Sequence, residues 1–161
     1  MVGAGLSSPA GGNAVVSAQA PNPCALLKIE EIQVLAGEAS VGDGVATSTP
    51  TIGSMACRYS WGTGVNRLKL DVIVTDAARM FPGMSAEQIK QRLAASVKAG
   101  GADVAIAEIG EAAVFTSDSA YYANAMASLK GRILEVHVDG QVARDKKDQV
   151  ISLLKTAASR L

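Results

Sequence analysis

Alternating apolar and polar residues predict most of the strands of this chain. From residue 68 to residue 75 apolar side chains occupy nearly every second position, and residues 55–60 show the same period of two. This alternation is typical of antiparallel strands with one buried face. Three further strands are predicted over residues 112–116, 122–129 and 132–138, with Lys130-Gly131 as the tight turn between the last two.

Helical periodicity accounts for other parts of the chain. A short helical turn is expected over residues 22–27, with Asn22 as its N-cap. An apolar stripe predicts a helix over residues 29–36, ended by Gly37. A capping box formed by Ser85 and Gln88 begins the clearest helix, over residues 86–99, and a last amphipathic helix covers residues 145–160. Residues 38–50 are rich in Gly, Ser and Thr, which favours a loop.

The element order α-β-β-α-β-β-β-α lacks the alternation that builds a parallel doubly wound sheet. We therefore expect an α+β fold, with a single antiparallel sheet of about five strands and helices packed on one face. Residues 22–161 are predicted to form one domain. Residues 1–21 carry no charge and are interpreted as a flexible tail or signal remnant, because Ala18-Gln19-Ala20 fits the pattern that precedes signal-peptidase cleavage. An ordinary tail on a cytosolic protein is the alternative.

Composition narrows the function classes. The 161 residues include 15 Lys+Arg and 15 Asp+Glu, so the chain lacks the basic excess that a nucleic-acid partner requires. No apolar run approaches the roughly 20 residues of a membrane span. One histidine and two cysteines are too few for a structural zinc site. We expect no nucleic acid, metal, cofactor or transmembrane segment, and a monomer or weak dimer.

The two cysteines, Cys24 and Cys57, bear on the cellular compartment. A bond between them would close a loop of about 34 residues and contribute roughly 3–4 kcal/mol. Their spacing is not that of a redox-active Cys-x-x-Cys pair, and Asn22-Pro23 does not fit a bacterial lipobox. A structural disulfide is favoured over two unrelated buried thiols, and it indicates an oxidising compartment, periplasmic or extracellular.

Several stretches together resemble a family of small exported bacterial proteins, many of them lipoproteins of unknown function. The resemblance rests on three segments: Asn22-Pro23-Cys24-Ala25-Leu26-Leu27 followed by Gly37, Cys57-Arg58-Tyr59, and Gly110-Glu111-Ala112-Ala113-Val114-Phe115. It covers nearly the whole of residues 22–161. The chain departs from the family at Lys28, where Thr or Ser is usual, and at Glu111, where Asp is usual. The resemblance implies export, a Cys24–Cys57 disulfide and an α+β fold, and it implies no reaction.

Catalytic chemistry finds little support in the residues. Glu135 and His137 are two apart on a predicted strand, so they project from one face, as a tuned general base would require. No third partner is evident, since Asp139 is expected beyond the strand end, and two solvated surface residues are the simpler interpretation. Gly62-Thr63-Gly64 is interpreted as a turn, because no third glycine and no helix follow it. No Gly-x-Ser-x-Gly motif occurs. We expect no catalytic residue and no enzyme.

Large side chains at loop positions are the remaining signal. Trp61, Phe81, Tyr121 and Tyr122 are candidates for partner binding if they converge on one side, because exposed aromatic residues often anchor a partner. Otherwise they complete the core. The expected function is an exported, non-catalytic binding or envelope-associated module for an unknown protein or small ligand. The alternatives are a secreted inhibitor or immunity-type protein, and a small-ligand carrier, which would need an apolar cavity of about 300 Å³ or more.

Overall fold

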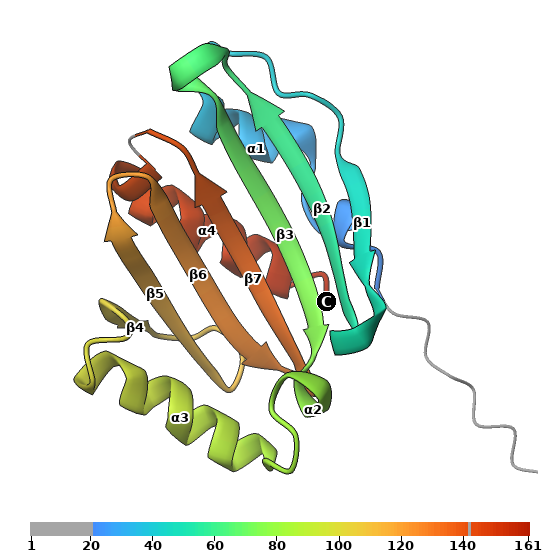
Figure 1. Cartoon of the computed structure of the whole chain (residues 1–161), viewed down its shortest axis with the longest axis vertical. Helices are drawn as coiled ribbons and strands as arrows, with labels where there is room; N and C mark the ends of the chain where they lie inside the picture. The colour runs from blue at the N-terminus through green and yellow to red at the C-terminus, as the bar shows by residue number, and fades with distance from the viewer. Residues whose placement is uncertain (1–20, 142) are drawn as a thin grey trace, which may run out of the picture.

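A seven-stranded antiparallel sheet forms the centre of the molecule (Figure 1), with strand order β1-β2-β3-β7-β6-β5-β4. The computed structural model describes residues 21–141 and 143–161, so the predicted tail lies outside it except for Pro21. The α+β class with a single antiparallel sheet is confirmed, whereas the expected number of about five strands is wrong. The strands are β1 (Val45–Thr49), β2 (Ser54–Trp61), β3 (Leu68–Asp76), β4 (Val104–Ile106), β5 (Ala112–Ser119), β6 (Tyr122–Leu129) and β7 (Arg132–Asp139).

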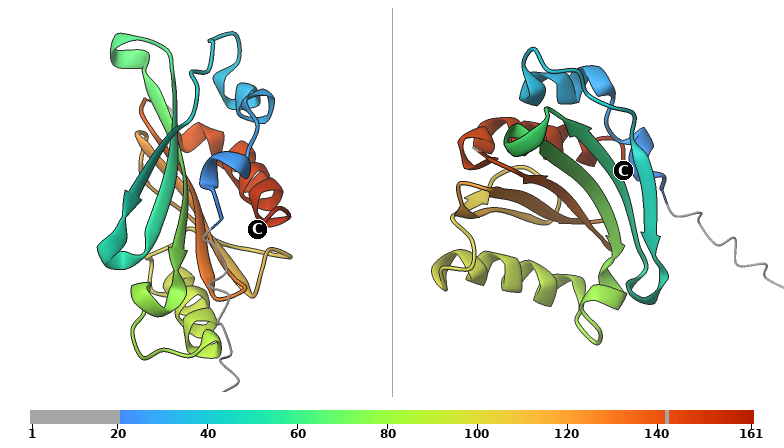
Figure 2. Two further views of the ribbon diagram at one scale, coloured as in Figure 1. Left: turned by 90° about the vertical axis from the view of Figure 1, so that its right-hand side faces the viewer. Right: turned by 45° about the horizontal axis from the view of Figure 1, so that its top comes forward.

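Helices lie on both faces of this sheet (Figure 2). One face carries α1 (Ile29–Ala36) and α4 (Lys147–Ala158), and the other carries α3 (Ala86–Lys98). The expectation that all helices pack on one face is wrong, because β5 is apolar on both sides: Phe115 joins the main core, while Val114 packs with Leu93 of α3. The shorter helices are η1 (Pro23–Ala25), η2 (Pro50–Ile52), η3 (Gly64–Asn66), α2 (Ala77–Met80) and η4 (Ala143–Lys146).

The main core lies between the sheet and the helices α1 and α4. Val72 of β3 is paired with Val136 of β7, and both are fully buried in the same core cluster as Leu154 of α4. Burial of large aliphatic side chains contributes roughly 1.5–3 kcal/mol each. The alternation seen in the sequence therefore identifies the inward face of the central strands correctly. Among the described helices, none combines the length and apolar composition needed to cross a bilayer.

Two strands and three short helices, η2, η3 and α2, go beyond the elements expected from the sequence. Strand β1 lies inside the predicted loop of residues 38–50, and all five of its side chains are exposed, so it shows no alternation. It is held by backbone pairing with β2, where Val45 lies opposite Arg58. Strand β4 has three residues and pairs with β5. The four-residue helix α2 is capped by Asp76, whose side chain accepts a hydrogen bond from the N–H of Ala78.

The N-terminal part of the domain is fastened to β2 by a disulfide. Cys24 and Cys57 are bonded, which confirms the predicted structural pair and connects η1 to the second strand. Nearby, the hydroxyl of Tyr59 donates a hydrogen bond to the carbonyl of Leu27 at 3.3 Å. Asn22 caps η1 as expected, since its side chain accepts from the N–H of Cys24. Helix α1 is therefore tied to the sheet just before it begins.

Candidate functional site

The four aromatic residues singled out from the sequence lie in different surroundings. Trp61 is 4% exposed and belongs to the main core, and Phe81 packs against the small cluster beneath α3. Tyr121 is 61% exposed. The Tyr122 ring lies against the ring of His137, with 4.8 Å between centroids. Two of the four thus complete hydrophobic clusters, and partner binding through these residues stays a prediction.

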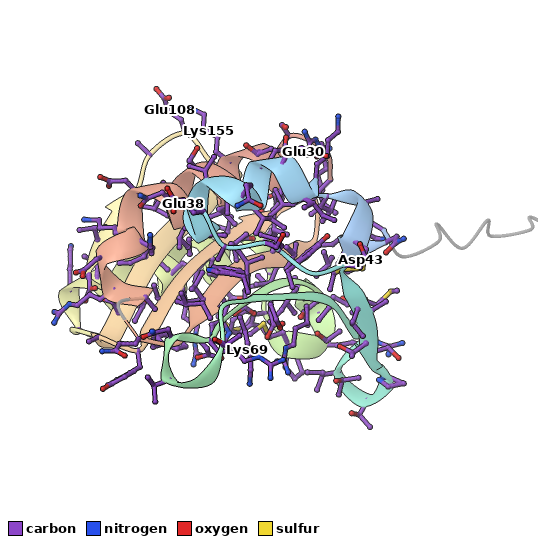
Figure 3. The ribbon with its side chains drawn as sticks, turned by 90° about the horizontal axis from the view of Figure 1, so that it is seen from above. Glu30, Glu38, Asp43, Lys69, Glu108 and Lys155 are labelled. Carbon is purple, nitrogen blue, oxygen red and sulfur yellow. A yellow bond between two sulfur atoms is a disulfide. The ribbon has the colours of Figure 1, made fainter. Side chains whose placement is uncertain are left out.

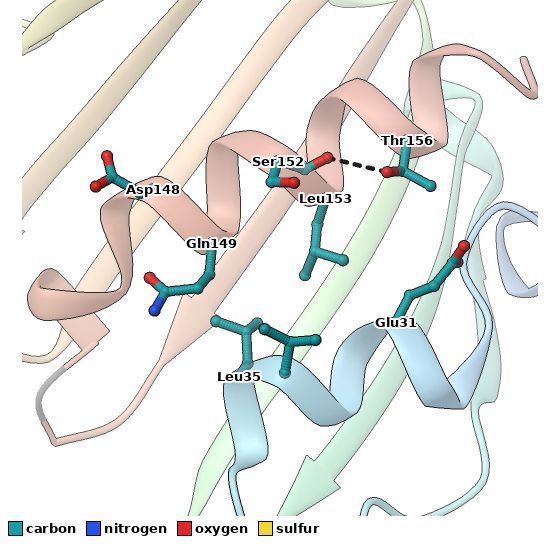
Figure 4. Close-up of a pocket in the computed structure, with 8 residues that line it drawn as sticks. Glu31, Leu35, Asp148, Gln149, Ser152, Leu153 and Thr156 are labelled. Carbon is teal, nitrogen blue, oxygen red and sulfur yellow. Dashed lines mark hydrogen bonds between the residues drawn. The ribbon is translucent and has the colours of Figure 1, made fainter.

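A groove lies between α1 and α4 and is lined by residues of both helices (Figure 4). Its volume is about 470 Å³. Val34 and Leu35 of α1 and Leu153 of α4 supply its apolar surface, and Val34 is 69% exposed there. The polar lining residues are Glu31, Asp148, Gln149, Ser152 and Thr156. The groove therefore combines an apolar floor with hydrogen-bonding groups along its walls.

An ion pair closes one end of this groove. Arg160, just after α4, donates hydrogen bonds of 2.7 and 2.6 Å to the two carboxylate oxygens of Glu31 on α1. The same guanidinium donates to the carbonyl of Leu26 at 2.9 Å. The hydrogen bond from Arg160 lowers the pKa of Glu31 to about 2, assisted by the N–H of Lys28. The two helices are consequently fixed to one another, although sequence reasoning gave no signal for this contact.

A polar cluster occupies the opposite face of the sheet, beyond the strip that α3 covers. We call Asn124, Glu135, His137 and Asp139 the polar-face cluster. Asn124 on β6 is paired in register with His137 on β7, and its Nδ2 donates to Glu135 Oε2 at 3.4 Å. Asp139 Oδ1 lies 3.0 Å from His137 Nε2. Asp139 belongs to β7, so the expectation that no third polar group accompanies Glu135 and His137 is wrong.

Two atoms of the polar-face cluster are buried without a hydrogen bond. These are Oδ1 of Asn124 and Nε2 of His137, which find no hydrogen-bonding partner within the described residues. The contact from His137 to Asp139 is short but lacks hydrogen-bond geometry. Buried polar atoms are nearly always satisfied, so unpaired ones mark strain or function. Glu135 and His137 are therefore not the two solvated residues that the sequence suggested.

Burial raises the pKa of Glu135 above its ordinary value, and the hydrogen bond from Asn124 opposes this shift only in part. Because the folded-state pKa is raised, the contribution of this group to stability is present at acidic pH and lost as the pH rises through that folded-state pKa. We expect Glu135→Gln to be more stable than the wild type at neutral pH and equal to it near pH 3. Urea denaturation across this pH range measures the difference.

Glu38→Gln is the control for this experiment, because Glu38 is exposed just after α1 and its replacement should leave the pH profile of stability unchanged. A Glu135→Gln variant that is less stable than the wild type at neutral pH would show that the ionised carboxylate is favourable in the fold.

Comparison of the chain with protein-family models, curated proteins and solved structures finds no match. The resemblance to small exported bacterial proteins therefore stays a prediction. The groove between α1 and α4 and the polar-face cluster are the geometry from which a function is argued.

Proposed function

We propose that this chain is an exported, non-catalytic binding protein that carries a small amphiphilic ligand in the groove between α1 and α4. The observation that carries the proposal is the groove itself, whose volume of about 470 Å³ lies within the range of about 300–1,000 Å³ typical of small-molecule sites. Its lining combines aliphatic side chains, of which Val34 is exposed, with a few polar groups, which is the composition such sites share. Among the functions expected from the sequence, this is the small-ligand carrier.

The charges around the groove select the head group of the ligand. Glu31 and Asp148 are the charged lining residues, and no basic residue of the described ranges, 21–141 and 143–161, lines this groove. Glu31 is already engaged by Arg160, whereas Asp148 has no ion pair within the described part of the chain. A cationic head group near Asp148 complements this arrangement, with the apolar chain lying along Val34 and Leu153. We therefore assign the ligand as an amphiphile with a protonated amine.

The rigidity of the groove supports binding rather than a packing defect. Helix α1 is connected through η1 to β2 by the Cys24–Cys57 bond, and to the end of α4 by the Glu31–Arg160 pair. A site whose walls are fixed before binding loses less conformational entropy when the ligand arrives. The disulfide also supports export, because such bonds persist in oxidising compartments.

Replacing Val34 by Gln is expected to weaken decylamine binding by about fivefold to tenfold, because part of the apolar contact of the alkyl chain is lost. Decylamine below its micellar concentration is titrated into ¹⁵N-labelled protein. Saturable shifts in the backbone amide signals of Leu35, Gln149 and Leu153 measure the affinity.

Val45→Gln is the matched control, since this valine is 61% exposed on β1 and does not line the groove. Its affinity for decylamine should equal that of the wild type. Decanoic acid, with the same chain and a carboxylate head, should bind at least fivefold more weakly. Absence of saturable shifts in the groove would overturn the proposed function, and equal binding of decanoic acid would overturn the assignment of the amine head group.

A further inference from the structure

A second pocket, which shares no lining residue with the groove, lies between the segment that follows α1 and the loop that joins β2 to β3. Its volume is about 460 Å³. The two walls are connected by a hydrogen bond of 2.9 Å from the N–H of Gly42 to the carbonyl of Ser60. Trp61 and Arg67 lie at the two ends of the loop and both line the pocket. The loop is the Gly62-Thr63-Gly64 segment that the sequence identifies as a turn.

Every polar side chain that lines this pocket can donate a hydrogen bond. They are the guanidinium of Arg67, the indole N–H of Trp61 and the hydroxyl groups of Ser40, Ser60 and Thr63. Among the described residues, no carboxylate lines it. Asp43, which follows the lining residue Gly42, does not line the pocket, and Figure 3 shows its side chain beside η1. The pocket therefore presents an excess of donors and one fixed positive charge.

The indole nitrogen of Trp61 is an independent sign of a missing acceptor. Trp61 is 96% buried, being 4% exposed, and its Nε1 has no hydrogen-bond partner within the described residues. A buried indole N–H normally finds an acceptor. Arg67 likewise makes no ion pair with any described residue. One group with several acceptor oxygens would satisfy both donors.

The loop holds its shape through its glycines. Gly62 and Gly64 have φ angles of 76° and 56°, in the left-handed region that favours glycine. A Cβ atom on Gly62 would lie 2.5 Å from the carbonyl oxygen of Asn66, so a side chain there would force the loop apart. Within the loop, the N–H of Arg67 donates to the carbonyl of Gly64 at 3.2 Å. The backbone at Arg67 is thus fixed relative to Trp61.

We infer that this pocket binds a small oxyanion, a phosphate or a carboxylate, between the guanidinium of Arg67 and the indole N–H of Trp61, with the hydroxyl groups of Ser60 and Thr63 as further donors. A guanidinium donates two parallel hydrogen bonds to either anion in a bidentate geometry. The site is separate from the groove between α1 and α4, and it does not depend on the proposed carrier function.

Trp61 is the only tryptophan of the sequence, so the molecule carries a built-in reporter at the site. The ¹H–¹⁵N spectrum of the full chain contains a single indole signal, which is followed during titration with inorganic phosphate and, separately, with sodium acetate. Sodium chloride at matched ionic strength is the reference. We expect a saturable shift of the indole signal with at least one of the two anions and a negligible shift with chloride. Saturation by phosphate alone identifies a phosphate site, and saturation by acetate identifies a carboxylate site.

Arg67→Met should weaken the binding at least tenfold while leaving the other amide signals in place, since Arg67 is exposed. Arg92→Met is the matched control, because it removes the same charge from α3 at the opposite end of the molecule. An indole signal that responds to chloride as it does to phosphate and acetate, or affinity that survives in Arg67→Met, would overturn the inference.

Discussion

Replacing Cys24 and Cys57 together by serine is expected to lower the free energy of unfolding by about 3–4 kcal/mol, the largest effect we foresee for a change confined to two atoms. The bond closes a segment that contains α1 and β1, and its loss enlarges the conformational freedom of the unfolded chain. Cys57 is fully buried, so the serine hydroxyl at that position adds a further cost. Urea denaturation measures this change in unfolding free energy, from the shift of the midpoint urea concentration multiplied by the slope m.

The control is the wild-type protein with its disulfide reduced. It should lose most of the same unfolding free energy without any change of sequence. The urea slope should rise or stay equal, since the unlinked denatured chain exposes at least as much surface. A double variant as stable as the wild type would show that the packing of α1 against α4, and not the covalent bond, holds the N-terminal part of the domain.

Replacing Arg58 by Met is expected to lower the free energy of unfolding by about 2–3 kcal/mol, because it leaves the carboxylate of Asp71 buried without its counter-charge. The Nε and Nη2 atoms of Arg58 donate to the two oxygens of Asp71 at 2.8 and 2.6 Å, across paired positions of β2 and β3. These hydrogen bonds raise the pKa of Arg58. The side chain of Asp71 is 8% exposed and that of Arg58 is half exposed, so the expected loss is smaller than for a fully buried pair. Thermal and urea unfolding measure it.

Adding Asp71→Asn to Arg58→Met should recover part of this loss, because the uncharged amide is less costly to bury. The resulting double-mutant cycle isolates the interaction between the two side chains. Lys90→Met is the comparison variant. The Lys90 ammonium lies 3.9 Å from the carboxylate of Glu87 on α3 and both side chains are exposed, so we expect this variant to lose less than about 0.5 kcal/mol of unfolding free energy. If Arg58→Met costs no more than Lys90→Met, Asp71 is solvated in the folded protein.

The parts of the fold that the sequence predicts are those in which side-chain periodicity and burial agree. Helix α1 was expected over the residues it occupies, because its buried residues Ile32 and Leu35 lie on one stripe and Gly37 follows it. Strand β7 was likewise expected, over residues 132–138, where apolar and polar side chains alternate. Strand β1 was missed because backbone pairing with β2, and no buried side chain, holds it in place.

The candidate sites depend on contacts that periodicity does not report. Alternation along β7 places Glu135 and His137 on one face, but their relation to Asn124 requires the register between β6 and β7. The Glu31–Arg160 pair joins α1, near the start of the sequence, to the end of α4, near its finish. Neighbouring residues Val114 and Phe115 of β5 are both apolar, which is the pattern of a strand buried on both faces. Phe115 packs in the main core and Val114 packs against α3, which therefore covers the second face of the sheet.

The strand order also has a consequence for how the chain folds. Strands β1, β2 and β3 form one meander of neighbours in sequence, and β4 to β7 form another. The two meanders meet at a single seam in the middle of the sheet, between β3 and β7, where Asp76 lies opposite Arg132 with all of residues 77–131 between them. Closing such a long loop is entropically costly, whereas hairpins between adjacent strands form quickly. We therefore expect the pairing of the two meanders along this seam to limit the folding rate.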